Sequence, residues 1–171
     1  SALIARGVPA VGLSGIDGGM LRAEREDAEL GLVGRVTLVD SSLVEELLAD
    51  GRVPVIAPAA LAVKGGALLN VNADTAAGAI AASVGARLLA FITDVPGVRD
   101  RNGKVVVHLD LERAKALIDD GTIEGGMLPK VEACLIAARA GCRSTRESSR
   151  AAGRSCVIRG LVSVENVSRR S

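Results

Sequence analysis

The sequence predicts an α/β protein, a three-layer α/β/α sandwich with a mostly parallel sheet. Strand-like and helix-like segments alternate along the chain, which is the pattern of such folds. Two strand-like segments, VPVIAP (53–58) and LLAFI (88–92), are continuous apolar runs, typical of parallel strands buried on both faces. Apolar residues make up 49% of the 171 residues, enough for a sizeable core. That core must be aliphatic, because Phe91 is the only aromatic residue.

Short strands and glycine-rich turns dominate the first half of the chain. Residues 1–7 resemble the end of a helix that stops at Gly7. A helix is expected after the capping box of Ser42 and Glu45, with its leucines forming an apolar face. A hairpin is expected over 60–71, around Lys64-Gly65-Gly66. The strands expected in this half are 8–13, 21–24, 33–39 and 53–58.

Helices dominate the second half. The first, over 75–84, is rich in Ala and Gly and is expected to pack very closely against a neighbour. A strand at 88–92 and a loop at 94–104 with a turn at Asn102-Gly103 follow. The last two helices are expected from Asp110 to Gly121 and from Gly126 to Ala140.

Composition excludes several classes of protein. Trp and Tyr are absent and the net charge is only +1, so we expect no nucleic-acid partner. No stretch of 18 apolar residues occurs, so we expect no membrane span. The three cysteines are odd in number and widely spaced, which predicts neither a disulfide framework nor a zinc site. A reduced, cytoplasmic location follows as the expectation.

The end of the chain differs from the rest. Residues 142–171 contain seven Arg and seven Ser among thirty positions. Such a composition buries little apolar area, so we expect a divergent, poorly ordered tail. Residues 1–141 then form the folded unit.

Three junctions between a strand or loop and a helix carry polar groups that suit a ligand, because ligands of such sheets bind where strands meet helices. At the first, Asn70, Asn72 and Asp74 stand where a strand turns into a helix, and amides can hold the carboxylate of a small ligand. Asp74 as a helix cap, with the asparagines as turn formers, is the alternative.

The other two junctions point to phosphate. The loop 93–98 (TDVPGV) could hold a nucleotide through its backbone, or be an ordinary turn. Lys130 stands near a helix N-terminus, where the helix dipole disfavours a cation, so either an anionic partner such as phosphate or a solvated lysine explains it. Neither GxxxxGK[ST] nor GxGxxG occurs, and the single histidine, His108, is more typical of a structural residue.

Read together, these segments resemble the amino acid kinase family. The resemblance is carried by GLSGIDGG (12–19), LGLVGRV (30–36), VPVIAP (53–58), LNVNADTAAGAIAASVGA (69–86), ITDVPGV (92–98) and DGTIEGGMLPKVEACLIAARAG (120–141). It covers residues 7–141 in order and at family-like spacing. The combination of NVNAD, TDVPGV and GGMxPKV is the specific part of the match.

The resemblance implies ATP-dependent phosphorylation of the side-chain carboxylate of N-acetyl-L-glutamate, the second step of arginine biosynthesis. It implies that Asn70 and Asn72 bind the acetylated substrate, that Asp74 organises the catalytic groups, and that Lys130 stabilises the transferring phosphoryl. ATP would enter with Mg²⁺, no metal site formed by protein alone is expected, and the complete enzyme would be a homo-oligomer. The residues that the resemblance assigns to ATP are Thr93, Asp94, Val95, Pro96, Gly97, Val98, Arg99, Thr122, Ile123 and Glu124.

The chain also departs from the family pattern. Nothing matches the family's first strand, which carries another catalytic lysine, or its glycine-rich phosphate loops. Ile16 stands where the family often has Lys, and the match stops after Gly141. These departures predict a fragment that holds the nucleotide-binding half of a kinase. A non-catalytic remnant is one alternative, and a sister kinase acting on carrier-bound aminoadipate, whose segment reads NVDGD, is another.

Overall fold

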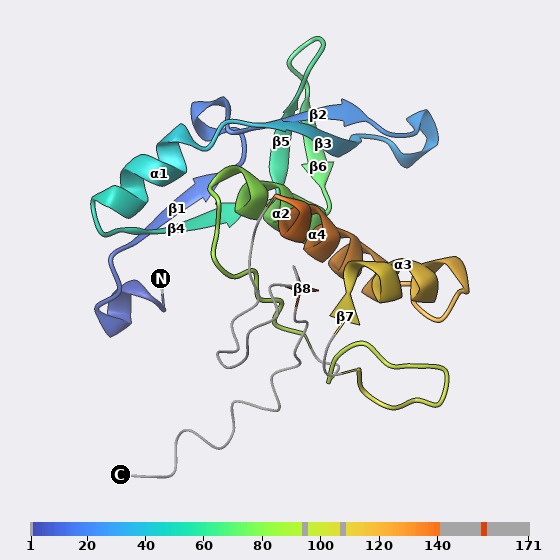
Figure 1. Ribbon diagram of the computed structural model, residues 1–171. Coiled ribbons are helices and arrows are strands. Elements are labelled where there is room, and N and C mark those ends of the chain that lie inside the picture. Colours follow the sequence, from blue (N-terminus) through green and yellow to red (C-terminus); the bar gives the residue numbers. More distant parts are fainter. Residues whose placement is uncertain (1, 94–95, 107–108, 141–154, 157–171) are drawn as a thin grey trace.

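The computed structural model describes residues 2–93, 96–106, 109–140 and 155–156. Its strands are β1 (Ala10–Ser14), β2 (Leu21–Arg25), β3 (Val33–Val39), β4 (Val53–Ala57), β5 (Ala59–Ala62), β6 (Leu68–Val71), β7 (Leu109–Asp110) and β8 (Ser155–Cys156). Its helices are α1 (Ser42–Ala49), α2 (Ala73–Ser83), α3 (Leu111–Asp119) and α4 (Met127–Arg139), with single-turn 3₁₀ helices at Ile4–Arg6, Asp17–Gly19 and Ala28–Leu30. The fold is α/β, as the sequence predicts (Figure 1).

The strands form a parallel pair and a small closed barrel. Strands β1 and β4 pair in parallel, with Gly12 opposite Val55, which confirms parallel pairing for the apolar strand 53–57. The expected burial on both faces is wrong for this strand, because its Val53 and Val55 are exposed. Strands β2, β3, β6 and β5 close into the barrel. Within it β2–β3 and β5–β6 are antiparallel, whereas β2–β5 and β3–β6 are parallel. The expected hairpin over 60–71 is thus confirmed, but the barrel's mixed pairing was not predicted.

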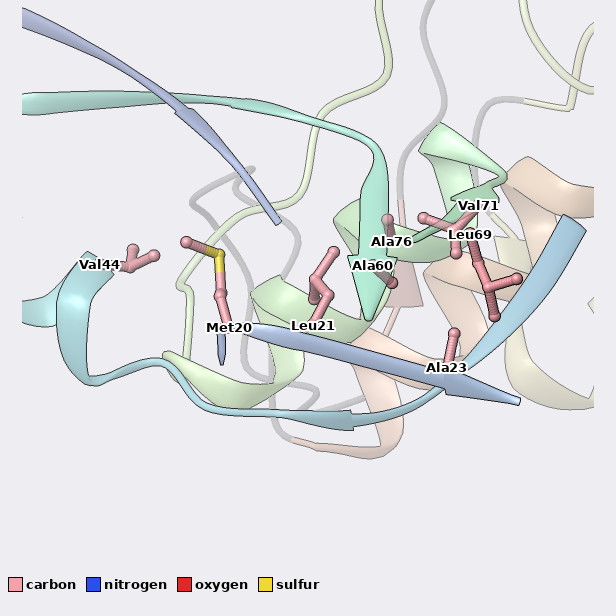
Figure 2. Close-up of a cluster of buried hydrophobic side chains, with 8 residues drawn as sticks. All are labelled: Met20, Leu21, Ala23, Val44, Ala60, Leu69, Val71 and Ala76. Carbon is pink, nitrogen blue, oxygen red and sulfur yellow. The ribbon is translucent and has the colours of Figure 1, made fainter. Parts of the chain in front are cut away.

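The main core joins the barrel to two helices. On β6, Leu69 and Val71 point inward while Leu68 and Asn70 are exposed, the period of two expected for a strand with one buried face. The core is aliphatic apart from the sulfur of Met20, as the composition requires. Figure 2 shows its buried side chains: Met20, Leu21, Ala23, Val44, Ala60, Leu69, Val71 and Ala76.

Helices α2 and α4 lie side by side (Figure 1). Gly78 of α2 is buried against α4, and a Cβ at this position would lie 2.8 Å from the Cα, Cβ and O atoms of Ala133. Only a residue without a side chain allows this approach without displacement of a helix. The predicted close packing of the Ala- and Gly-rich helix is confirmed.

Two local predictions are wrong. The capping box of Ser42 and Glu45 does not form: the Ser42 hydroxyl donates to Asp40, and the Ser41 hydroxyl donates to Oε1 of Glu45 at 2.6 Å. The segment 88–92 is not a strand, although its residues favour one. A strand is defined by its pairing with a neighbour, and this segment pairs with no strand among the described residues.

Cys134 of α4 is buried and disulfide-bonded, which the sequence analysis did not anticipate. Of the Arg/Ser-rich tail, only Ser155–Cys156 is described, and it pairs with β7 in antiparallel fashion. His108 and the remainder of 142–171 lie outside the described residues. No helix in the described ranges has the length and apolarity needed to cross a bilayer.

Candidate active site

Asn72 caps α2 and so fixes the first turn that carries Asp74. The Asn72 side-chain oxygen accepts hydrogen bonds from the backbone N–H of Asp74 at 2.9 Å and of Thr75 at 3.1 Å. Thr75 closes the turn by donating its hydroxyl to the Asn72 carbonyl at 2.9 Å. The cap is therefore Asn72, and the alternative that Asp74 is the cap is wrong. Because the Asn72 oxygen is engaged, its side-chain NH₂ is the group left to face a ligand.

Asp74 and Lys130 form an ion pair between α2 and α4. The Lys130 ammonium donates to Asp74 Oδ2 at 2.8 Å, a typical length for a charge-assisted hydrogen bond. The Lys130 side chain is only 20% exposed, and the Asp74 side chain only 22%. The alternative that Lys130 is a solvated lysine is wrong. The structure instead brings together two residues that the sequence singled out 56 positions apart.

The pair stands where two helix N-termini meet. Asp74 meets Lys130, Gly78 meets Ala133, and Ala81 and Ala137 share a buried cluster, so α2 and α4 run in the same direction. Their positive dipole ends lie at one place, and Lys130 adds a full positive charge. Asp74 neutralises the charge of Lys130 and holds its ammonium in place. An arrangement of this kind suits an anion such as a phosphoryl group.

Asn70 stands two residues before this cap. It lies on the exposed face of β6, and its backbone N–H donates to the Leu32 carbonyl at 2.8 Å. This bond joins β6 to the end of the loop before β3. The side chain of Asn70 is therefore presented to solvent next to the strand end from which α2 begins.

The two segments assigned to ATP share a buried cluster beside Lys130. Val98 of the first segment and Ile123 of the second pack in one cluster with Val131, the residue after Lys130. Because both apolar side chains are buried, these two residues can meet a nucleotide only through their backbone. Pro96, Arg99 and Glu124 are exposed, and Thr122 is half-buried. Thr93 is also half-buried, and Asp94 and Val95 lie outside the described residues.

Arg101 follows the first of these segments by two residues and bonds to the second, a contact that sequence reasoning missed. Its guanidinium lies 3.0 Å from Asp120 Oδ2 and donates to the Thr122 hydroxyl at 3.3 Å. Hydrogen bonds from the side chain and the backbone of Thr122 hold the pKa of Asp120 below its ordinary value, and the charge of Arg101 contributes. The Asp-Gly-Thr sequence at 120–122 signals only the turn, because Asp commonly bonds the backbone two residues on, and not the contact with Arg101.

Cavities lie on the barrel and on α2. One of about 440 Å³ is bordered by the strands and hairpin of the barrel, including Arg25 and Lys64. The other, of about 320 Å³, lies on α2 and reaches Ala73, the neighbour of Asp74. Within the described ranges, no three His, Cys, Asp or Glu side chains gather to hold a metal ion.

Comparison with known proteins gives a consistent result. The sequence profile of the amino acid kinase family matches residues 1–146. The chain is 53% identical over 138 residues to an acetylglutamate kinase from Geobacillus stearothermophilus, covering 80% of this chain and 53% of that protein. It is 49% identical over 149 residues to an acetylglutamate kinase from Roseiflexus castenholzii, covering 85% and 56%. The chain thus spans about half the length of the curated relatives it matches.

The fold also has a close counterpart among solved structures. The crystal structure of smu.665 from Streptococcus mutans UA159 superposes with a TM-score of 0.74 at 31% sequence identity. The superposition covers 83% of this chain and 58% of that one. Here too, the match accounts for most of this chain and for little more than half of its counterpart.

Proposed function

Because the chain belongs to the amino acid kinase family, we propose that it forms the part of an acetylglutamate kinase that holds ATP and the transferring phosphoryl group. The reaction is phosphorylation of the side-chain carboxylate of N-acetyl-L-glutamate by ATP. One observation carries the proposal: the Lys130–Asp74 ion pair at the joined N-termini of α2 and α4. The identity to acetylglutamate kinases, 53% and 49% in two relatives, supports the choice of acceptor.

The reaction requires little of the protein beyond positioning the two reactants and neutralising their negative charge. A carboxylate oxygen of the acceptor attacks the γ-phosphorus, the bond to the β–γ bridging oxygen breaks, and ADP leaves. The acceptor is already an anion, so no proton has to be removed and no general base is needed. Catalysis then consists of aligning two negatively charged reactants and neutralising the charge that gathers on the phosphoryl oxygens.

The proposed reaction assigns a role to each residue of the site. Lys130 faces the phosphoryl group, and Asp74 fixes the position of its ammonium. Asn70 and the NH₂ group of Asn72 bind the acetylglutamate. The loop 93–99 and the segment 122–124 hold ATP, with Val98 and Ile123 contributing backbone groups. Mg²⁺ arrives with the triphosphate, and the complete enzyme works in the cytoplasm as a homo-oligomer.

Two other functions receive less support. Carrier-bound aminoadipate is disfavoured as the acceptor because the segment reads Asn72-Ala73-Asp74. A chain that folds without catalysing transfer is favoured by one observation, the match to only about half of each relative. We therefore expect the isolated chain to show little kinase activity, since phosphoryl transfer needs all of its charge-neutralising groups at once.

The proposal is tested with a restored enzyme, in which this chain is joined to the part of the Geobacillus stearothermophilus kinase that lies outside the match. Acetylglutamyl phosphate is trapped with hydroxylamine and measured as the hydroxamate. The restored enzyme should form the hydroxamate from N-acetyl-L-glutamate and MgATP, whereas the isolated chain should not. A folded restored enzyme that prefers another acceptor would refute the proposed substrate, and one that transfers to no acceptor would refute the proposed activity.

A further inference from the structure

The chain folds back on itself at the end of the first segment assigned to ATP. The Val106 N–H donates to the Val98 carbonyl at 2.8 Å, which closes what we call the 98–106 excursion. Within it, one oxygen of the Asp100 carboxylate accepts two backbone N–H groups, each at 2.9 Å. A carboxylate bonded to the backbone in this way holds a turn in one conformation. Arg101, the next residue, therefore starts from a fixed backbone.

The second segment assigned to ATP is held by bonds of its own. The Ile123 N–H donates to the Leu117 carbonyl at 2.8 Å, which ties the segment 122–124 to α3. The Asp120 carboxylate accepts the Thr122 N–H at 2.9 Å, which fixes the turn between helix and segment. Each segment is thus ordered within itself, and contacts between the two set their separation.

One apolar contact and one polar contact join the two segments. Val98 and Ile123 pack in the same buried cluster, but an apolar contact has little directional preference. The polar contact is directional: the Arg101 guanidinium lies 3.0 Å from Asp120 Oδ2, and its Nε donates to the Thr122 hydroxyl at 3.3 Å. A planar guanidinium that bonds two acceptors fixes orientation as well as distance.

We propose that Arg101 is a positioning residue for ATP, which holds the two segments at the separation that the nucleotide needs. The inference rests on the proposed function, because that function assigns ATP to both segments. A site that is already ordered binds more tightly, since less conformational entropy is lost on binding. The Arg101 side chain is 68% exposed and the Asp120 side chain 31%, so the contribution of the pair to folding is small. Its effect should fall on nucleotide affinity.

The first test is kinetic and uses the restored enzyme. Arg101→Ala should raise the KM for ATP by about threefold to tenfold, whereas kcat and the KM for acetylglutamate should stay within about twofold. Direct titration with MgATP, without acetylglutamate, should show the same increase in Kd. Arg101→Lys should recover only part of the affinity, because an ammonium lacks the planar fork. Arg113→Ala, which removes an exposed arginine of α3, is the matched control and should change neither constant.

The second test measures the link in the 171-residue chain without any ligand. Amide exchange at Val106 and Ile123 should speed up by about threefold or more in Arg101→Ala, while exchange in α1 should not change. In the restored enzyme, Asp120→Asn should raise the KM for ATP as well, and adding it to Arg101→Ala should cause little further increase, because the two residues act through one contact. The difference between the unsubstituted enzyme and Arg101→Ala should shrink in about 1 M KCl, since salt screens an exposed ion pair.

The possible results separate this inference from the proposed function. An unchanged affinity for ATP in folded Arg101→Ala, or an equal loss in Arg113→Ala, would overturn the inference and leave the function standing. A fall in kcat with the KM for ATP unchanged would overturn it too. A restored enzyme whose ATP affinity depends on Arg101, but which does not phosphorylate acetylglutamate, would refute the proposed function alone. A restored enzyme that binds no MgATP would refute both.

Discussion

Replacement of Lys130 by alanine in the restored enzyme should lower kcat far more than it changes substrate binding. The ammonium lies 2.8 Å from Asp74 and is four-fifths removed from solvent, so no water or mobile ion takes its place easily. Its main interaction should arise when negative charge gathers on the phosphoryl oxygens. Interactions made chiefly in the transition state lower kcat when they are lost, whereas uniform binding contacts raise KM.

The magnitude follows from the geometry. Loss of one preorganised charge-stabilising group costs about 10²- to 10³-fold in kcat. Here the loss should reach at least the lower value, because Lys130→Ala also leaves the Asp74 carboxylate unpaired beside the phosphates. The KM for acetylglutamate should stay within about threefold, since Lys130 is placed on the phosphoryl group and not on the acceptor. Lys130→Arg should restore little activity, because the planar guanidinium differs from an ammonium in shape and reach.

The assay is steady-state hydroxamate formation by the restored enzyme, with unfolding measured in parallel. Lys115→Ala is the matched control, because Lys115 is an exposed lysine on α3, and it should leave kcat unchanged. Breaking the Asp74 pair should also lower the free energy of unfolding by about 1–3 kcal/mol, between the values for exposed and buried pairs. An unchanged kcat in folded Lys130→Ala would refute the catalytic role of this lysine.

Three further outcomes are expected. Asn72→Ala should lower the free energy of unfolding by about 1 kcal/mol, the usual effect of losing an N-cap, with the KM for acetylglutamate raised as well; urea titration and kinetics measure both. Gly78→Leu should lower the melting temperature, because its side chain meets Ala133 and overpacking costs about 1–3 kcal/mol; full stability would show that the helices separate freely. The depressed pKa of Asp120 stabilises the fold above the ordinary carboxyl pKa of about 3.9, and this stability is lost as the pH falls through the folded pKa. Asp120→Asn should therefore flatten the loss of stability that sets in as the pH falls below the ordinary carboxyl pKa, as followed by urea unfolding, and an unchanged acid limb would contradict the assignment.

The elements of the fold were largely predictable, because most are encoded by local patterns. The parallel strand 53–57, the hairpin around Lys64-Gly65-Gly66 and the cap at Asp110 all follow from residues close in sequence. The strand expected at 88–92 was wrong for a physical reason. Its residues favour an extended chain, but a strand also requires a partner edge, and no local pattern supplies one.

The site was predictable residue by residue but not as an arrangement. Asn72, Asp74 and Lys130 each stood out in the sequence, yet their pairing depends on how α2 crosses α4. That crossing is governed by the contact of Gly78 with Ala133, which no spacing rule reveals. The link between Arg101 and Asp120 was missed for the same reason, because exposed charges on two separate loops carry no signal of being neighbours.

The role of the Lys130–Asp74 pair is tested most directly by a crystal structure of the restored enzyme with MgADP, an aluminium fluoride and N-acetyl-L-glutamate. The fluoride stands in for the phosphoryl group in transfer. We expect the Lys130 ammonium within about 3.2 Å of a fluoride and still bonded to Asp74, with the Asn70 side chain in contact with the acetylglutamate. An ammonium more than about 5 Å from the fluoride would contradict the claim that this ion pair is the centre of phosphoryl transfer.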